Sequence, residues 1–402
     1  MINTMRLTRR GLIRAGAAGV VASGLTLGAG RAAAEQSGNR AELRRGGYLP
    51  GPGTTGPLPG TRLTKITADA SRRGGEPGRF TVEDRNAVFD GYEFWAEVVP
   101  AEGSVFRNCV FRGIDPNLVT NKNARAAIVA HASPHFVLEN CLIDPDGWLT
   151  QRERPHRVIH SNGIRGADFE ARWCEIRNVA DGIGIVGHGA EADDARSKIT
   201  DIDRCWIHAG SYVNDYYVTH SDGQIHGDAV QFHTGKNITI RGCTLGGVRD
   251  VAGYNVWQFN GPNRDGFVGG SPADTAGGRN TGDDHYTSVL MVKQEVADDV
   301  WRRLENVVIE DNGIGGGVAS VNNVMSSTTP GQTWSSLTIS GNRFFERGPD
   351  WGRHLDQGQP KDEGAGYYLL KGRGSLATIE GNTIWDWQNE VDTGVPIPIT
   401  GG

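Results

Sequence analysis

The residues most able to do chemistry lie close together in one segment, from His220 to His233. This segment holds three of the chain's eleven histidines, His220, His226 and His233, together with Asp222 and Asp228. Imidazole and carboxyl groups transfer protons in catalysis, and aspartate oxygens are preferred calcium ligands. The spacing of the three histidines matches no standard zinc pattern. The segment is therefore interpreted as part of a site that transfers protons or holds a calcium ion.

A repeat determines which elements must position these residues. Successive copies are 32, 33, 31, 38, 69, 30 and 40 residues apart, so a constant core alternates with loops of variable length. This pattern is typical of a solenoid of short strands, in which equivalent side chains of neighbouring coils stack about 4.8 Å apart. Each copy has apolar residues on alternate positions around a central cysteine or asparagine: Cys109, Cys141, Cys174, Cys205, Cys243, Asn312, Asn342 and Asn382.

A second short strand accompanies most copies, over residues 127–130, 162–165, 182–185, 229–233, 289–293 and 319–322. Alternation along the strand at 229–233 turns Val230 and Phe232 inward, so Gln231 and His233 face outward. By the same rule Lys293 faces outward on the next coil and lies beside His233. The second strands therefore present one outward row of polar side chains.

This row is the predicted site. Asp181 precedes Gly182 as Asp228 precedes Ala229, so two carboxylates on neighbouring coils can stack, and Arg165 projects outward another coil away. Residues 211–227 and 261–284 are expected to form the walls of a groove. We predict catalytic roles for Lys293, His233, Asp228 and Arg165, substrate binding by Gln231, His220, His226, Tyr216 and Tyr217, and calcium binding by Asp222 and Asp228.

The repeat region resembles the pectate-lyase-like family of right-handed parallel β-helix proteins. The likeness rests on the Asn-Cys and Gly-Asn ladder strands and on segments such as 235–243, and it covers about three quarters of the chain. It implies an all-β fold, a single-stranded right-handed parallel β-helix. The family includes polysaccharide lyases, inverting hydrolases, esterases and non-catalytic surface proteins, so the resemblance alone does not select a reaction.

Three functions are weighed for the predicted groove. Elimination is placed first: Lys293 would remove the proton next to a uronate carboxylate, and calcium would bridge the substrate to the acidic protein. Inverting hydrolysis would instead use two carboxyl groups among Asp222, Asp228 and Asp181. A non-catalytic carbohydrate-binding or cell-surface role is the third. Aromatic side chains such as Trp206 and Tyr216 offer stacking platforms for sugar rings under each of them.

The first 34 residues differ in type from the rest. Arg9 and Arg10 precede an apolar stretch from Ala15 to Gly30 and a small-residue cleavage site, which predicts a twin-arginine export signal. Residues 35–84 are expected to form an arm and cap, and residues 85–402 the β-helix domain. The predicted mature chain carries 36 basic and 47 acidic residues, which disfavours nucleic acid and anionic membranes as partners. We therefore expect a secreted monomer that acts on a polysaccharide.

All five cysteines belong to the ladder of stacked positions. Neighbouring side chains of such a ladder point in parallel, which suits disulfide geometry poorly. The cysteines are therefore predicted to be reduced, buried and inert.

Overall fold

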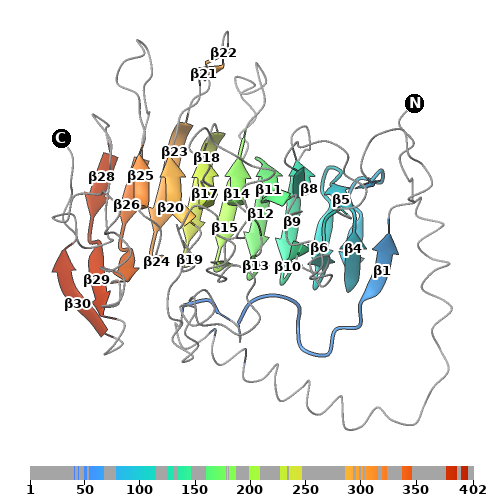
Figure 1. The fold of residues 1–402 in the computed structure, drawn as a ribbon, viewed down its shortest axis with the longest axis horizontal. Coiled ribbons are helices and arrows are strands. Elements are labelled where there is room, and N and C mark those ends of the chain that lie inside the picture. The colour runs from blue at the N-terminus through green and yellow to red at the C-terminus, as the bar shows by residue number, and fades with distance from the viewer. Residues whose placement is uncertain are drawn as a thin grey trace, which may run out of the picture.

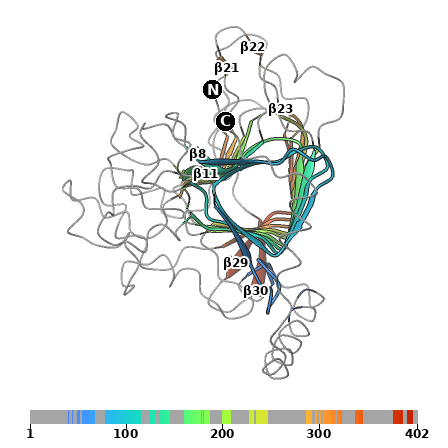
Figure 2. The ribbon, with the colours of Figure 1, turned by 90° about the vertical axis from the view of Figure 1, so that its right-hand side faces the viewer.

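Short strands pair in parallel from coil to coil in this computed structural model and build three long sheets (Figure 1). The structure describes residues 40, 44, 49–51, 54–67, 78–114, 125–130, 135–145, 160–177, 179, 181–186, 199–208, 227–232, 235–246, 286–292, 296–297, 300–301, 304–315, 319–323, 337–345, 377–386 and 391–396. Seen along the axis, the sheets surround a single core (Figure 2). The predicted parallel β-helix is confirmed.

The three long sheets are called A, B and C, and each coil from β2 to β27 contributes one strand to each of them, in the chain order A, C, B. Sheet A contains β2 (Arg79–Thr81), β5 (Glu97–Val99), β8 (Arg125–Ala130), β11 (His160–Gly166), β14 (Asp181–Ile185), β17 (Gly227–Phe232), β20 (Tyr286–Val292) and β25 (Ala319–Asn323). Sheet C contains β3 (Val88–Asp90), β6 (Val105–Arg107), β9 (Phe136–Glu139), β12 (Phe169–Arg172), β15 (Thr200–Asp203), β18 (Gly235–Arg241), β23 (Leu304–Glu310), β26 (Leu337–Ser340) and β28 (Ala377–Glu380).

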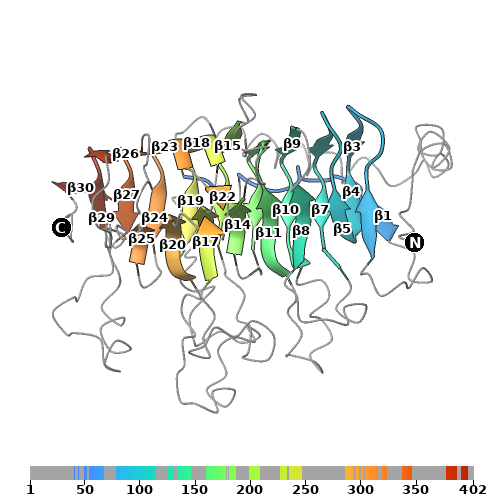
Figure 3. The same cartoon turned by 90° about the horizontal axis from the view of Figure 1, so that it is seen from above.

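Sheet B closes the coil on its third side and ends in an antiparallel strand, β30 (Val391–Pro396), which covers the last parallel edge. A separate antiparallel pair is formed by β21 (Val296–Ala297) and β22 (Val300–Trp301). Sheet B contains β1 (Thr64–Thr67), β4 (Tyr92–Trp95), β7 (Val110–Phe111), β10 (Leu142–Ile143), β13 (Glu175–Ile176), β16 (Trp206–Ile207), β19 (Thr244–Gly246), β24 (Gly313–Gly315), β27 (Arg343–Phe345), β29 (Thr383–Asp386) and β30 (Val391–Pro396). Figure 3 shows the strands following one another along the axis.

The ladder of cysteines and asparagines lies at the corner between sheets C and B. All five thiols are free and fully buried, as predicted. Cys141 donates through its thiol to the carbonyl oxygen of Phe106 at 3.3 Å, and Asn342 donates through Nδ2 to that of Ile309 at 3.0 Å. Both side chains therefore satisfy a carbonyl of the preceding coil, which explains why asparagine replaces cysteine in the same register. Burial raises the pKa of the Cys141 thiol, in keeping with an inert side chain.

The residue before each ladder position makes the turn between sheets C and B. Its φ lies between 51° and 65° in all eight copies, in the left-handed region that favours Gly, Asn and Asp. These turn residues are Asn108, Asn140, Trp173, Arg204, Gly242, Asp311, Gly341 and Gly381.

The solenoid begins before residue 85, because β1 and β2 pair in parallel with β4 and β5. The segment predicted as an arm and cap thus supplies the first strands itself. Upstream of β1 the chain runs back along the outside of sheet B, seen as the blue trace beneath the strands in Figure 1. Gly56 donates its backbone N–H to the Trp173 carbonyl oxygen at 3.0 Å, and Leu58 donates to Asn108 Oδ1 at 3.2 Å. None of the helices within the described part of the chain has the length and hydropathy needed to cross a membrane.

Candidate active site

Two aspartates of sheet A lie on neighbouring coils, as the sequence predicted. The parallel pairing of β14 with β17 aligns Ile183 with Val230 and Gly184 with Gln231. In this register the backbone N–H of Asp228 donates to Oδ1 of Asp181 at 2.9 Å. Asp228 is fully buried, whereas Asp181 is partly exposed. Asp181 is therefore the residue of this pair that has surface accessible to a ligand.

A buried amide on the preceding coil holds the second oxygen of Asp181. Asn162 pairs with Asp181 across β11 and β14, and its Nδ2 donates to Oδ2 of Asp181 at 3.1 Å. Asn162 is 4% exposed, so its amide stays fixed between the strands. The Asp181 carboxyl thus accepts one hydrogen bond on each oxygen and has a defined orientation.

Glycines make this arrangement possible. A Cβ on Gly182 would lie 2.3 Å from Cγ2 of Ile207 and 2.4 Å from the carbonyl oxygen of Ala229. A Cβ on Gly184 would lie 2.7 Å from Nδ2 of Asn162. The chain after Asp181 can therefore approach the core closely, and the Asn162 amide can lie over the backbone of Gly184.

The environment of Asp181 favours its protonated form. Burial raises the pKa of Asp181 to about 7, although the Asp228 amide, the charge of Arg165 and the Asn162 amide act in the opposite direction. A carboxyl group with this pKa holds a proton in a substantial fraction of molecules near neutral pH. Such a group is suited to general acid catalysis.

A second outward row runs beside the carboxyl pair. Arg165 pairs with Gly184, which pairs with Gln231, and Gln231 pairs with Met291 on the next coil. Arg165 and Gln231 are both partly exposed, as expected for outward positions. The inward neighbours Val230 and Phe232 are fully buried, as predicted. A guanidinium and an amide thus flank a glycine close to Asp181.

Most of the other predicted site residues lie outside the described residues: Lys293, His233, His220, His226, Tyr216, Tyr217 and Asp222. Phe232 pairs with Val292 across β17 and β20. The prediction that His233 lies beside Lys293 assumes this same register for the residue that follows each of them. Within the described ranges, no group of three or more His, Cys, Asp or Glu side chains is arranged to hold a metal ion. Calcium binding by Asp222 and Asp228 stays a prediction.

Two features differ from expectation. Asn162 received no role from the sequence, although it precedes Gly163 as Asp181 precedes Gly182, and this shared pattern was the available signal. Trp206 is 2% exposed and stacks on His208, with ring centroids 3.5 Å apart. Its indole is therefore part of the packing and is not a platform for a sugar ring.

Comparison with known proteins gives one remote structural likeness. The catalytic domain of a GH87 alpha-1,3-glucanase in complex with tetrasaccharides is 9% identical, with a TM-score of 0.36. The alignment covers 82% of this chain, and the chain spans 56% of the length of that structure. No family model matches the sequence, and no curated protein matches it.

Proposed function

We propose that this chain is an exported polysaccharide-degrading enzyme of the pectate-lyase-like type that cleaves glycosidic bonds at the outer face of sheet A. The observation that carries the proposal is the carboxyl group of Asp181, a partly exposed residue: the group is oriented by two hydrogen bonds and its pKa is raised to about 7. In hydrolysis, protonated Asp181 would donate its proton to the leaving glycosidic oxygen while water adds to the anomeric carbon and gives its proton to a second carboxylate, for which Asp222 is the predicted candidate.

The neighbours of Asp181 would serve this step as positioning groups. Asn162 and the Asp228 backbone amide fix the carboxyl, so the proton is presented in a constant direction. Arg165 and Gln231 would donate hydrogen bonds to the sugar on either side of Gly184. Hydrolysis is favoured over elimination here because a proton donor is the group that the described residues supply.

Elimination is the second candidate, and Arg165 is the observation that favours it. A guanidinium matches the planar carboxylate of a uronate, whose neighbouring carbon loses the proton in this reaction. The base predicted for this step, Lys293, and its predicted partner His233 lie outside the described residues. Elimination by this pair is thus supported by the sequence pattern and by Arg165.

Incubation of the mature protein with neutral glucans and with uronate-containing polysaccharides tests the proposal. New reducing ends without ultraviolet absorbance of an unsaturated product are expected for hydrolysis, whereas that absorbance would indicate elimination. Binding without cleavage of any polysaccharide would instead support the non-catalytic alternative and overturn the proposed enzyme.

A further inference from the structure

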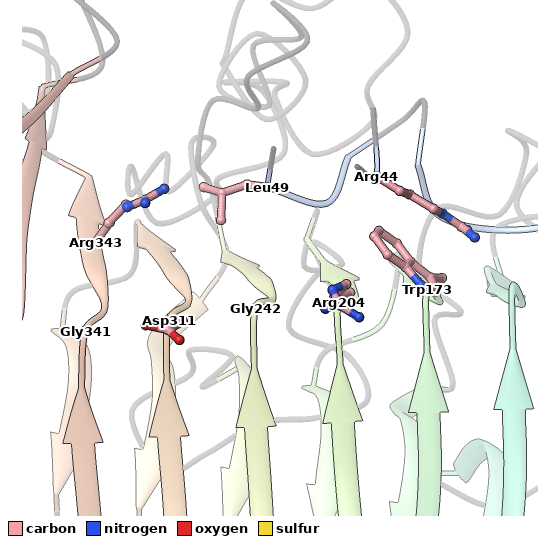
Figure 4. A pocket seen from close by; sticks show the side chains of 8 residues that line it. All are labelled: Arg44, Leu49, Trp173, Arg204, Gly242, Asp311, Gly341 and Arg343. Carbon is pink, nitrogen blue, oxygen red and sulfur yellow. The ribbon is translucent and has the colours of Figure 1, made fainter. Parts of the chain in front are cut away.

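A pocket of about 260 Å³ lies between the N-terminal arm and the turns that join sheets C and B (Figure 4). In a three-sided coil this corner lies across the core from sheet A, so the pocket is separate from the Asp181 site. Its walls come from the arm and from the turns of five coils: Arg44, Leu49, Trp173, Arg204, Gly242, Asp311, Gly341 and Arg343.

The arm is fixed over this corner by Arg44. Its guanidinium donates to the carbonyl oxygen of Thr54 at 2.7 Å and to Oδ1 of Asn140 at 2.6 Å, and it lies 4.0 Å from the centroid of the Trp173 ring. Arg204, on the next coil, lies 5.4 Å from the same ring and donates through Nη1 to Oδ2 of Asp203 at 3.1 Å. One indole therefore holds two guanidinium groups at the same end of the pocket.

Gly242 and Gly341 leave room along the floor of the pocket. They occupy turn positions on coils beyond Arg204, and neither has a side chain to fill the space: Gly242 lies beneath Leu49 and Gly341 beneath Arg343 (Figure 4). Arg343 lines the far end, and Asp311 lies between the two glycines. The volume lies just below the range of about 300–1,000 Å³ for small-molecule pockets, which suits a single small ligand.

The charge of the lining is opposite to that of the whole chain. Three arginines and one aspartate surround the pocket, whereas the chain has a net charge of −6. Burial and the charges of Arg40 and Arg204 lower the pKa of Arg44 to about 10, although Cys174 acts in the opposite direction. Asp203 neutralises part of this charge through its ion pair with Arg204, and an anion placed between Arg204 and Arg343 would offset the rest.

Two of the pocket residues occupy backbone positions that do not suit them. Six of the eight left-handed turns use Asn, Asp or Gly, but the neighbouring turns at Trp173 and Arg204 do not. A side chain of this type costs roughly 1–2 kcal/mol in the left-handed region. Backbone strain of this kind is concentrated at ligand sites, where the side chain is needed for another purpose.

We propose that this pocket binds an anionic group, a carboxylate or a sulfate, carried by an acidic sugar unit or present as a free ion. Arg204 and Arg343 donate to the anion from the two ends, and Trp173 keeps Arg44 and Arg204 in place. The proposal rests on the pocket alone and does not depend on the reaction proposed for sheet A.

Titration of the full chain by saturation-transfer NMR with sodium glucuronate, with glucose as the uncharged counterpart, tests this site. Glucuronate is expected to bind and glucose is not. Arg204→Asn should weaken glucuronate binding roughly tenfold through loss of the charge. The fold should be retained, because asparagine suits the left-handed turn. Asp311→Asn, a substitution in the same row of turns, should strengthen binding severalfold by removing the acidic group that the described residues contribute to the lining.

Competition by sodium sulfate distinguishes the two sources of the anion. Displacement of glucuronate by sulfate would show that the charged group alone is recognised, and absence of displacement would show that the sugar ring is also required. Equal binding of glucose and glucuronate would overturn the proposal, as would unchanged affinity in Arg204→Asn. Polysaccharide cleavage should be unaffected by Arg204→Asn, so failure of this site and failure of the proposed function are separable.

Discussion

In one row on the outer face of sheet C, acidic and basic side chains alternate from coil to coil, whereas in the row of sheet A that holds Asp181 two aspartates follow one another. Adjacent carboxylates in the sheet C row are separated by an arginine, with ion pairs such as Arg107–Glu139 at 2.6 Å and Arg241–Asp203 at 3.6 Å. The row consists of Asp90, Arg107, Glu139, Arg172, Asp203, Arg241 and Glu310 in register.

This difference separates charges that support the fold from charges available for chemistry. If a strand of sheet C paired with the next strand but one, like charges of this row would lie side by side. The alternation of charge therefore favours the observed pairing of each strand with its direct neighbour. In sheet A, burial of the Asp181 carboxyl outweighs the opposing charge of Arg165 and the pKa rises to about 7. A solenoid does not need such a carboxyl for its register, so the sheet A pair is the better candidate for catalysis.

Replacing Asp181 should have the largest effect. Asp181→Asn removes the proposed proton donor and should lower kcat by about 10²- to 10⁴-fold, the range typical of general acid catalysis. Asp201→Asn is the matched control on sheet C, because burial also raises the pKa of Asp201. Steady-state kinetics on the cleaved polysaccharide measures both variants. Equal losses of activity in the two would show that sheet A has no special role.

The pH dependence of stability should reveal the same carboxyl without any substrate. The folded protein holds a proton on Asp181 up to about pH 7, and the unfolded chain only up to about pH 4. The stabilisation from this proton is complete below about pH 4 and is lost as the pH rises through 7. Because the side chain is partly exposed, we expect a loss of about 2 kcal/mol rather than the full value of the shift.

Urea unfolding of the wild type and of Asp181→Asn between pH 4 and pH 8 measures this loss. Relative to the wild type, the variant should gain stability with rising pH, since asparagine does not titrate. A constant difference between the two proteins across this range would contradict the raised pKa of Asp181.

Crowding the Asn162 amide should change the Asp181 site more mildly. In Gly184→Ala the new Cβ would meet Nδ2 of Asn162 at 2.7 Å and displace its hydrogen bond to Asp181. Loss of a donor to the charged carboxylate raises its pKa further, so the upper limb of the pH–rate profile should move to higher pH by about 1 unit or less. Asn162→Ala should give the same shift without crowding. A lower rate with an unmoved limb in both variants would exclude Asn162 as a positioning residue.

The sequence predicted the repeat well because its signal is local. Cys109 and Asn312 have apolar residues at the same positions on either side, so the pattern predicted that they stack. The alternation of side chains along the strand correctly placed Val230 and Phe232 in the core. The hydrogen bond between Asn162 and Asp181 depends on how β11 and β14 pair, and the Asn-Gly and Asp-Gly pairs of the sequence show only that the two positions are similar.

The course of the N-terminal arm was likewise beyond the sequence pattern. The contact of Arg44 with Trp173 joins segments more than 120 residues apart, and the arm carries no repeat that would align it with the coil of Trp173. The alternating charges of sheet C were present in the sequence, two residues before each ladder position. Their meaning depended on knowing that these positions are neighbours in space.

Completing the alternation on sheet C should have the smallest effect, and it has a sign that can be checked. Ser340 occupies the row between Glu310 and Glu380, where the next arginine would fall. Ser340→Arg should stabilise the fold by about 0.5 kcal/mol, and Ser340→Glu should destabilise it by a similar amount. Both changes should shrink in high salt, because the side chains are accessible to solvent. Urea unfolding midpoints at low and high salt measure the pair. Changes of the same sign in the two variants would mean that packing at position 340, and not charge alternation, governs this face.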